Sequence, residues 1–289
     1  MKASPSLWPS PSPSPSPRAL TALALLFLAA CGAEPPIGPS VPPPAPLPTA
    51  TAAAMPAVKA VAVPPAIQSL LDAVDRSDAD RALDKGRHPG EMLAFFGIRP
   101  AMKVAELGAG LGYTSELLAR AVGPAGRVYG QNSRFILERF AEKPWSARLA
   151  LPVMKNVIRV DREFDDPLPP EATGLDAVIM VLFYHDTYWM KTDRAAMNRA
   201  ILKALKPGGV YGVIDHSGRP GSGVAEAQSL HRIEEAAVRA DVEAVGFRYD
   251  ATGDFLRNPA DTRDWNDAPG AAGERRGSSD RFVLRFVKP

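Results

Sequence analysis

Short apolar runs alternate with helix-like segments from Pro65 to the end of the chain, and this alternation constrains the fold more than any other feature. Apolar runs of about four to eight residues between turn residues are typical of buried strands, and the helices between them are typical of parallel crossovers. The sequence therefore predicts one α/β domain, residues 66–289, with a mostly parallel sheet and helices on both faces. Strands are expected at Lys103–Leu107, Arg127–Gly130, Val157–Val160, Asp176–Val181 and Val210–Ile214.

The C-terminal part of the chain is expected to close the sheet with two antiparallel strands. Alternating apolar and polar residues occur at Phe247–Phe255 and again at Arg281–Lys288. Between them, Leu256–Asp280 is polar and rich in glycine, and a loop of that length is typically a functional lid or disordered. Helices are expected at Ile67–Val74, Asp80–Phe96, Thr114–Val122, Arg134–Glu142, Thr192–Leu205 and Val224–Val245.

The N-terminal region resembles a bacterial lipoprotein signal. After Arg18 comes ALTALALLFLAA, an apolar run too short to span a bilayer, and it ends at Cys31, the one cysteine of the chain. The resemblance to a lipobox implies a signal peptide, residues 1–30, and lipidation of Cys31. A linker rich in proline and alanine follows in residues 31–65. We therefore expect a lipid-anchored protein of the bacterial cell envelope, on the periplasmic face of the outer membrane.

The charge of the chain gives no reason to expect nucleic acid as a partner. The formal net charge is +2, and residues 1–30 contain two basic side chains, Lys2 and Arg18, and no acidic ones, so the mature chain is neutral. A single cysteine also excludes an intramolecular disulfide framework and a cysteine-rich metal site.

The segment from Glu106 to Tyr113, Glu-Leu-Gly-Ala-Gly-Leu-Gly-Tyr, joins an expected strand to an expected helix. Glycine lets a ligand approach the backbone, and a helix N-terminus offers free N–H groups. The wider segment VAELGAGLGYTSELLA is similar to motif I of class I S-adenosylmethionine (SAM) dependent methyltransferases. LKPGGVYGVID, about a hundred residues later, is similar to the segment that leads into their fifth strand.

The resemblance covers residues 90–289. The segments DRALDKGRHPGEMLAFFG and SDRFVLRFVKP are more narrowly similar to a group of predicted extracytoplasmic methyltransferases. It implies a Rossmann-like fold with a seven-stranded, mostly parallel sheet and an antiparallel terminal strand. It also implies SAM as the cofactor, lying across the carboxyl ends of the first four strands. By this resemblance Glu106 would face the methionine amino group, and Gly108 and Gly110 would lie beneath the cofactor. Gly112 is also expected in the cofactor site. Asn132 would contact the ribose and Asp161 the adenine.

The residue expected at the ribose departs from the family pattern. Relatives carry an acidic residue at the end of the second strand, whereas this chain has Asn132. An amide makes no charge-assisted hydrogen bond to a ribose hydroxyl, which predicts weaker SAM binding by about 1–2 kcal/mol.

Histidines and aspartates follow two neighbouring strands where each strand ends. Tyr184, His185 and Asp186 follow the fourth strand, and Asp215 and His216 follow the fifth. Histidine is suited to proton transfer near neutral pH, so either His185 or His216 is expected to act as a general base, and His231 at the start of the next helix could face the same cleft. Tyr184 could line the pocket for a small-molecule acceptor or pack in the core.

These residues leave several functions open. The leading interpretation is a SAM-dependent methyltransferase with no metal, acting on an unknown small molecule or envelope component. A non-catalytic exported protein that binds another ligand or a metal is the alternative, and a site made of two histidines and an aspartate belongs to it. A nicotinamide-dependent dehydrogenase is disfavoured because GxGxxG is absent. A nucleic-acid methyltransferase is disfavoured because FYHD stands where NPPY-like sequences occur.

Overall fold

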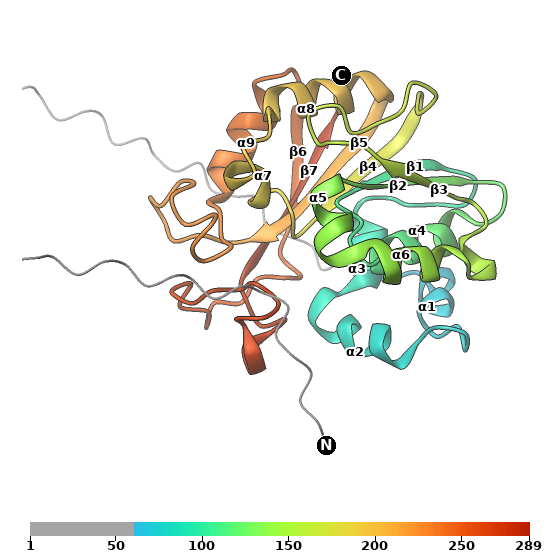
Figure 1. Ribbon diagram of the computed structural model, residues 1–289, viewed down its shortest axis with the longest axis horizontal. Helices are drawn as coiled ribbons and strands as arrows, with labels where there is room; N and C mark the ends of the chain where they lie inside the picture. Colours follow the sequence, from blue (N-terminus) through green and yellow to red (C-terminus); the bar gives the residue numbers. More distant parts are fainter. Residues whose placement is uncertain (1–60) are drawn as a thin grey trace, which may run out of the picture. The chain divides into compact units, whose positions relative to one another are not determined.

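A computed structural model describes residues 61–289 of the chain (Figure 1). The expected signal peptide, Cys31 and residues 32–60 of the expected linker lie outside this range. Among residues 61–289, the longest apolar helices fall short of what a bilayer crossing requires.

The described residues contain a seven-stranded sheet, as the resemblance implies, and its strand order is β3-β2-β1-β4-β5-β7-β6. Strands β1 to β5 are parallel, and β7 lies antiparallel between β5 and β6. The strand order reverses between β1 and β4, the place where ligands bind in open α/β sheets. The strands are β1 (Lys103–Leu107), β2 (Arg127–Asn132), β3 (Val157–Asp161), β4 (Leu175–Val181), β5 (Leu205–His216), β6 (Arg248–Gly253) and β7 (Arg281–Val287).

Helices cover both faces of the sheet, which confirms a doubly wound α/β fold. On one face, α4 (Tyr113–Val122) packs on β1 and β2 and is covered by α1 (Pro65–Leu71) and α3 (Pro89–Phe95). On the other face, α8 (Arg194–Ala204) packs on β5 and α9 (Glu235–Glu243) packs on β6 (Figure 1). Buried aliphatic residues of the central strands form the core between these layers.

Two of the expected helices are divided in the structure. The segment expected at Asp80–Phe96 forms α2 (Asp78–Arg87) and α3, which meet at His88 in the left-handed backbone region, with φ of 46°. Pro89 accounts for the break, because a proline disfavours the helical conformation of the residue before it.

The segment expected as a helix at Arg134–Glu142 is divided as well. It forms α5 (Arg134–Ile136), a π-helical turn at Leu137–Ala141 and α6 (Glu142–Leu149). Pro144 offers no N–H to the preceding turn, which favours this widening.

The helix expected at Val224–Val245 is wrong over its first half, since only α9 is helical in this range. Before α9 the chain turns at His231, whose φ is 53°, and Ile233 forms a parallel bridge with Ser217 just after β5. The Ile233 N–H donates to the carbonyl of His216 at 3.0 Å. Pairing with the sheet therefore overrides the local helical pattern and brings His231 to the end of β5.

Candidate active site

The glycine loop, residues 108–112, joins β1 to α4, and its glycines differ in the space that surrounds each of them. Gly108, Gly110 and Gly112 all have positive φ, between 55° and 87°, a region that favours glycine. A Cβ at Gly112 would collide with the buried ring of Trp145, so this glycine is required for packing. A Cβ at Gly110 would meet nothing nearer than 4.0 Å, which leaves open space beside the backbone there.

Glu106 carries a buried carboxylate at the carboxyl end of β1. It accepts a hydrogen bond from the Ser115 hydroxyl in the first turn of α4, where the helix dipole favours negative charge. Burial raises its pKa to about 7, against smaller opposing effects of Ser115, Thr114 and the Arg87 guanidinium. Within residues 61–289, no basic side chain forms an ion pair with this carboxylate. A ligand that carries a positive charge would satisfy it.

Two amide side chains from the end of β2 hold the glycine loop in place. Gln131 Oε1 accepts from the Gly108 N–H at 3.0 Å, and Asn132 Oδ1 accepts from the Gly110 N–H at 2.8 Å. Asn132 Nδ2 also donates to the Gly110 carbonyl at 3.1 Å, and Asn132 is fully buried. The amide expected to contact a ribose is thus bonded to the loop, and a ribose at this position would have to replace these bonds.

The far end of the expected cofactor cleft contains Asp161 and two aromatic rings. Asp161 lies opposite Asn132 in the β2–β3 register, is exposed, and pairs with Arg159 Nε at 2.8 Å. Phe183, which follows β4, stacks on Phe164 with ring centroids 4.9 Å apart. The Phe183 ring lies 2.8 Å from where a Cβ at Gly108 would be, so it covers that glycine. The expectations from sequence did not include these two rings.

Asp215, at the end of β5, organises the first histidine. Its Oδ1 lies 2.7 Å from His185 Nδ1, and its Oδ2 accepts from the His185 backbone N–H at 2.7 Å. The backbone N–H of His216 donates to the same carboxylate at 2.8 Å. Asp215 and His185 are both buried. An aspartate at Nδ1 places the ring proton there and turns Nε2 away from Asp215.

His185 Nε2 faces a second histidine and a second carboxylate. It lies 3.1 Å from His231 Nδ1 and 3.2 Å from Asp186 Oδ1. Burial alone would lower the pKa of His185, but the carboxylates of Asp186 and Asp215 outweigh burial and raise this pKa well above 6.5. With no other cation present, the ring is positively charged at neutral pH and is a poor proton acceptor.

His216 has the opposite protonation. Burial lowers its pKa below 6.5 despite the neighbouring carboxylates of Asp267 and Asp215. His216 Nδ1 lies 2.5 Å from Asp267 Oδ2 and 2.9 Å from the Ser279 hydroxyl. The ring is therefore neutral near pH 7, and with its one proton on Nδ1, beside the Asp267 carboxylate, Nε2 is the nitrogen that can accept a proton. Asp267 and Ser279 belong to the long loop and were missed from sequence, because nothing local marks them.

Tyr184 lies in the core between α8 and α9. Its hydroxyl accepts from Asn198 Nδ2 at 3.0 Å and lies 3.3 Å from Asp241 Oδ2. The side chain is fully buried, and burial raises its pKa well above 10. The structure therefore brings His185, Asp215 and His216 together and places the Tyr184 hydroxyl in a separate polar network.

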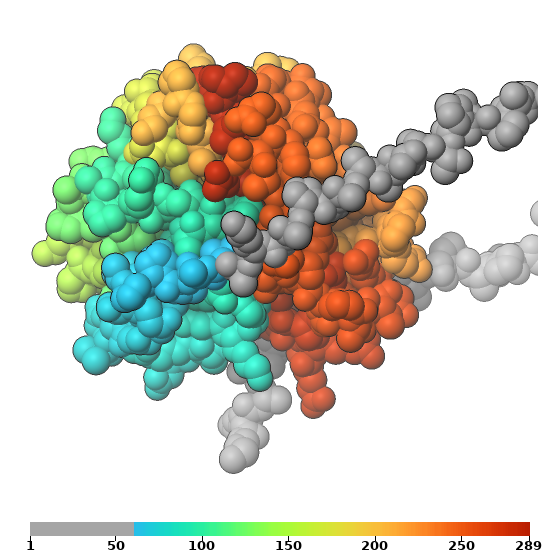
Figure 2. All heavy atoms as spheres, turned by 180° about the vertical axis from the view of Figure 1, so that it is seen from behind, coloured from blue at the N-terminus to red at the C-terminus, as the bar shows by residue number. Residues whose placement is uncertain are grey.

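The long loop of residues 254–280 packs against the segment that carries His231. Arg232 is fully buried and pairs with Asp261 Oδ2 at 2.8 Å, and its guanidinium lies 4.6 Å from the centroid of the Trp265 ring. Asn266 Nδ2 donates to the Ser229 carbonyl at 3.0 Å. Figure 2 shows this loop, in orange-red, at the same end of the domain as the blue N-terminal helices. Trp265 and Asn266 therefore contact this segment, and the loop supports His231.

Comparison with known proteins identifies the fold. The chain matches a SAM-dependent methyltransferase from Aquifex aeolicus with a TM-score of 0.51 and 17% identity, over 74% of this chain and all of that chain. The fold is that of class I methyltransferases. No protein-family model and no curated protein sequence matches the chain.

Two further structures are similar to the chain at lower scores. An arsenic(III) SAM methyltransferase from Chlamydomonas reinhardtii is 19% identical, with a TM-score of 0.48, over 78% of this chain and 74% of that chain. Fibrillarin from Aeropyrum pernix, with natively bound SAM, is 14% identical, with a TM-score of 0.42, over 66% and 68%. Likeness at this level shows the fold alone, because one fold hosts many functions.

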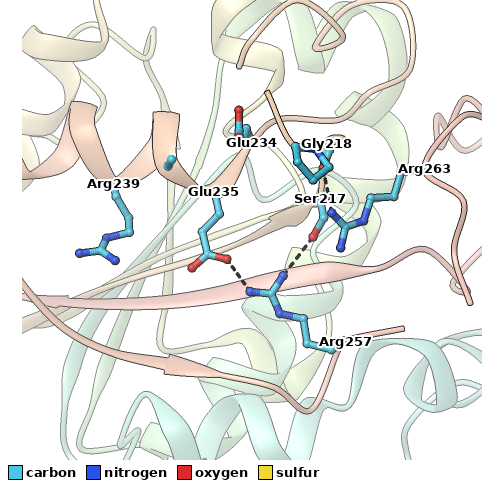
Figure 3. A pocket seen from close by; sticks show the side chains of 9 residues that line it. Ser217, Gly218, Glu234, Glu235, Arg239, Arg257 and Arg263 are labelled. Atoms are coloured by element: carbon cyan, nitrogen blue, oxygen red, sulfur yellow. Dashed lines mark hydrogen bonds and ion pairs between the residues drawn. The ribbon is translucent and has the colours of Figure 1, made fainter. Parts of the chain in front are cut away.

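The methyltransferase fold here carries a cavity of about 380 Å³ beyond the end of β5 (Figure 3). Its lining includes Ser217, Glu235 and Arg257, which form a hydrogen-bonded chain in which Arg257 bridges the other two. Arg263, also in the lining, pairs with Asp280 at 2.7 Å. Its lining begins at Ser217, one residue after His216, and in the sheet β4 lies between β5 and β1, which leads into the glycine loop.

Proposed function

We propose that this chain is a SAM-dependent methyltransferase that acts on a small molecule or a component of the cell envelope. The fold is the first support. The observation that carries the proposal is the buried carboxylate of Glu106 beside the N-terminus of α4 and the glycine loop, which within residues 61–289 forms no ion pair with a basic side chain. The amino group of SAM is positively charged and would form an ion pair with this carboxylate. The open space beside the Gly110 backbone leaves room for a ligand.

The residues fit the amino end of SAM better than its ribose end. Glu106 would bind the ammonium group, and the open side of Gly110 would lie against the cofactor. At the ribose end, Asn132 would release its bonds to Gly110, and the stacked rings of Phe183 and Phe164 would exclude water from the bound ligand. SAM, when bound, supplies an electrophilic methyl group for transfer to the acceptor.

His216 is the proposed general base of this reaction. Its ring is neutral, its Nδ1 is engaged by Asp267 and Ser279, and its Nε2 would take a proton from an acceptor hydroxyl, amine or thiol. Asp267 would stabilise the imidazolium that results. General-base catalysis of this kind contributes about 10²–10⁴ in rate, and proximity of the two substrates contributes the rest.

Gly110→Asp is expected to weaken SAM binding by at least about a hundredfold, which corresponds to about 3 kcal/mol. The new side chain would fill the open space beside the loop and place a negative charge near the cofactor's carboxylate. Aspartate tolerates the left-handed backbone, and a Cβ at this position has no neighbour within 3.5 Å, so the fold should be retained. Calorimetric titration of SAM into the purified protein measures the effect.

Gly174→Asp is the matched control, because Gly174 also has positive φ and open space but precedes β4 at the opposite end of the sheet. It should bind SAM like the parent protein. His216→Gln should also bind SAM normally while methyl transfer to a test acceptor slows. Equal SAM affinity in Gly110→Asp and Gly174→Asp would reject the assigned cofactor site.

A second candidate is a non-catalytic protein that has kept the methyltransferase fold and binds a different ligand. The bonds between Asn132 and Gly110 and the cover of Phe183 over Gly108 favour it, because both occupy space that SAM would need. The same titration separates the two candidates. Micromolar SAM affinity supports the methyltransferase, whereas no SAM binding by the folded parent protein supports the second candidate.

The proposed location is the bacterial cell envelope, with Cys31 carrying the lipid anchor. This proposal depends on the lipobox-like sequence Leu28–Cys31 alone. Cys31→Ser should shift the protein expressed in a bacterial host from the membrane pellet to the soluble fraction and abolish incorporation of labelled palmitate. Continued pelleting of Cys31→Ser would contradict lipidation.

A further inference from the structure

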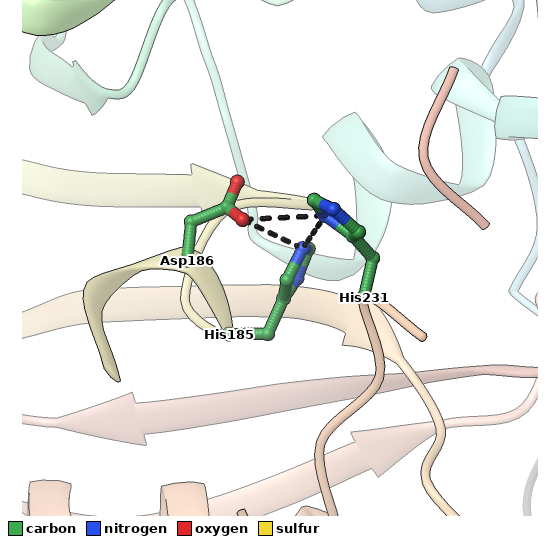
Figure 4. Close-up of side chains that lie close together, drawn as sticks. All are labelled: His185, Asp186 and His231. Carbon is green, nitrogen blue, oxygen red and sulfur yellow. Dashed lines mark hydrogen bonds and ion pairs between the residues drawn. The ribbon is translucent and has the colours of Figure 1, made fainter. Parts of the chain in front are cut away.

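We propose that His185, Asp186 and His231 form a binding site for a divalent transition-metal ion. His185 Nε2, His231 Nδ1 and Asp186 Oδ1 lie at the corners of a nearly equilateral triangle with sides of 3.1, 3.2 and 3.3 Å (Figure 4). Metal–ligand bonds of about 2.0–2.1 Å place the ligand atoms of one ion about 2.9–3.4 Å apart, for octahedral to tetrahedral angles. The three donors therefore already have the spacing that one ion requires.

The ligand types select the class of metal. Two imidazole nitrogens and one carboxylate oxygen suit Zn²⁺ and Fe²⁺, whereas Ca²⁺ and Mg²⁺ prefer sites made of oxygen atoms. Three protein ligands leave at least one coordination position for water or a substrate, as in catalytic sites. Asp186 and His231 each expose about an eighth of their side chains, so an ion can reach the site from solvent.

A second layer of contacts fixes the orientation of the ligands. Asp215 holds His185 Nδ1 at 2.7 Å, an arrangement of carboxylate, histidine and metal that orients the ring and makes Nε2 a better ligand. The Trp189 indole N–H donates to Asp186 Oδ1 at 2.7 Å. Metal-binding histidines typically have such partners, and their loss weakens metal binding by about 10–100-fold.

Contacts of the residues before and after His231 hold it beside His185 and Asp186. Arg232, the next residue, is fixed by Asp261 and by the Ser217 carbonyl, and the preceding carbonyl of Leu230 accepts from the Asp267 N–H at 3.0 Å. His231 itself has a left-handed backbone, which is uncommon for a residue other than glycine. These contacts give the ring a defined position at the end of β4 and β5.

The buried charges of the cluster require a cation. Asp186 and Asp215 are both largely or fully buried, and within residues 61–289 they form ion pairs with His185 and His231. Either a proton on the histidines or a metal ion can balance these carboxylates. A metal ion balances both and also satisfies the two facing nitrogens, His185 Nε2 and His231 Nδ1, which lie 3.1 Å apart.

The test is titration of Zn²⁺, and in a separate anaerobic arm Fe²⁺, into purified protein that has been stripped with EDTA. We expect one equivalent to bind with micromolar or tighter affinity in at least one arm, with a rise in the unfolding temperature. The preferred metal identifies the ion. His231→Gln should weaken binding at least a hundredfold, and Asp215→Asn, which removes the positioning carboxylate, should weaken it about 10–100-fold.

His88→Gln is the matched control, since His88 is partly exposed, pairs with Glu91 on α3 and lies outside the triangle. It should bind metal like the parent protein. Circular dichroism confirms that each variant is folded. Absence of stoichiometric binding of both metals, or equal affinity in folded His231→Gln, would overturn the proposal. SAM is absent from these titrations, so their outcome is independent of the proposed methyltransferase activity.

Discussion

Arg232→Met is expected to lower the free energy of unfolding by about 3–5 kcal/mol, the range typical when one partner of a buried ion pair is removed. The side chains of Arg232 and Asp261 are 0% and 1% exposed, and their charged atoms lie 2.8 Å apart. Arg232 also donates to the carbonyls of Ser217 and Trp265, both at 3.1 Å. Methionine fills much of the same volume but leaves Asp261 as a buried carboxylate without its cation.

Urea unfolding followed by circular dichroism measures this change. Arg134→Met serves as the control, because Arg134 is 81% exposed and an exposed ion pair such as the one with Glu138 contributes little to stability. Adding Asp261→Asn to Arg232→Met removes the unpaired charge and should restore part of the loss. A loss in Arg232→Met no greater than that in Arg134→Met would show that the long loop does not depend on this pair.

The sheet could be predicted from sequence because buried parallel strands leave a strong local signal. The β1 strand has the predicted bounds, Lys103–Leu107, since an apolar run there lies between a turn and a glycine loop. The antiparallel pairing of β6 and β7 was also predicted and is confirmed. Strand ends were less accurate: β2 extends to Asn132, beyond the predicted Gly130, because Gln131 and Asn132 continue to pair with β3.

The segment before α9 shows where local patterns fail. Residues 224–230 have a composition compatible with a helix, but the course of the chain is set by Arg232 and Ile233. The first binds Asp261, 29 positions away, and the second pairs with Ser217. Contacts at such separations leave no local signal, so a window of sequence predicts helix where the tertiary structure requires a turn.

The candidate site was predictable where it depends on strand ends and unpredictable where it depends on loops. Carboxyl ends of parallel strands share one edge of the sheet, so the proximity of His185 and Asp215 follows from topology. Which histidine is neutral does not follow from it, because carboxylates lie beside both rings: burial outweighs them at His216, and they outweigh burial at His185. Likewise, sequence cannot tell that the Asn132 amide is bonded to the glycine loop.

Glu106→Gln is expected to remove a pH-dependent contribution to stability of about 3 kcal/mol. The pKa of Glu106 is about 7 in the folded protein and 4.5 without burial, and this difference of about 2.5 corresponds to about 3 kcal/mol. Because the folded state holds the proton more tightly, the contribution is fully present below pH 4.5. It is lost as the pH rises to 7, where the folded carboxyl ionises without a cationic partner.

Glutamine has nearly the same shape and stays neutral, so the Glu106→Gln variant should lack this loss. The measured quantity is the difference in unfolding free energy between parent and variant at pH 4.5 and pH 8, in which the titration of all other groups cancels. Asp161→Asn, at an exposed carboxylate on β3, is the control substitution. A difference independent of pH would mean that Glu106 titrates normally despite its burial.

The Glu106→Gln variant also tests whether the Glu106 carboxyl binds SAM. If Glu106 binds the ammonium group of SAM, the carboxyl must lose its proton first, so affinity should rise about tenfold per pH unit between pH 5 and its pKa of about 7. In Glu106→Gln the affinity should be lower and nearly constant over this range, since glutamine does not titrate. A parent protein that binds SAM with no such pH dependence would place the amino group elsewhere and leave Glu106 as a buried acid that only affects folding.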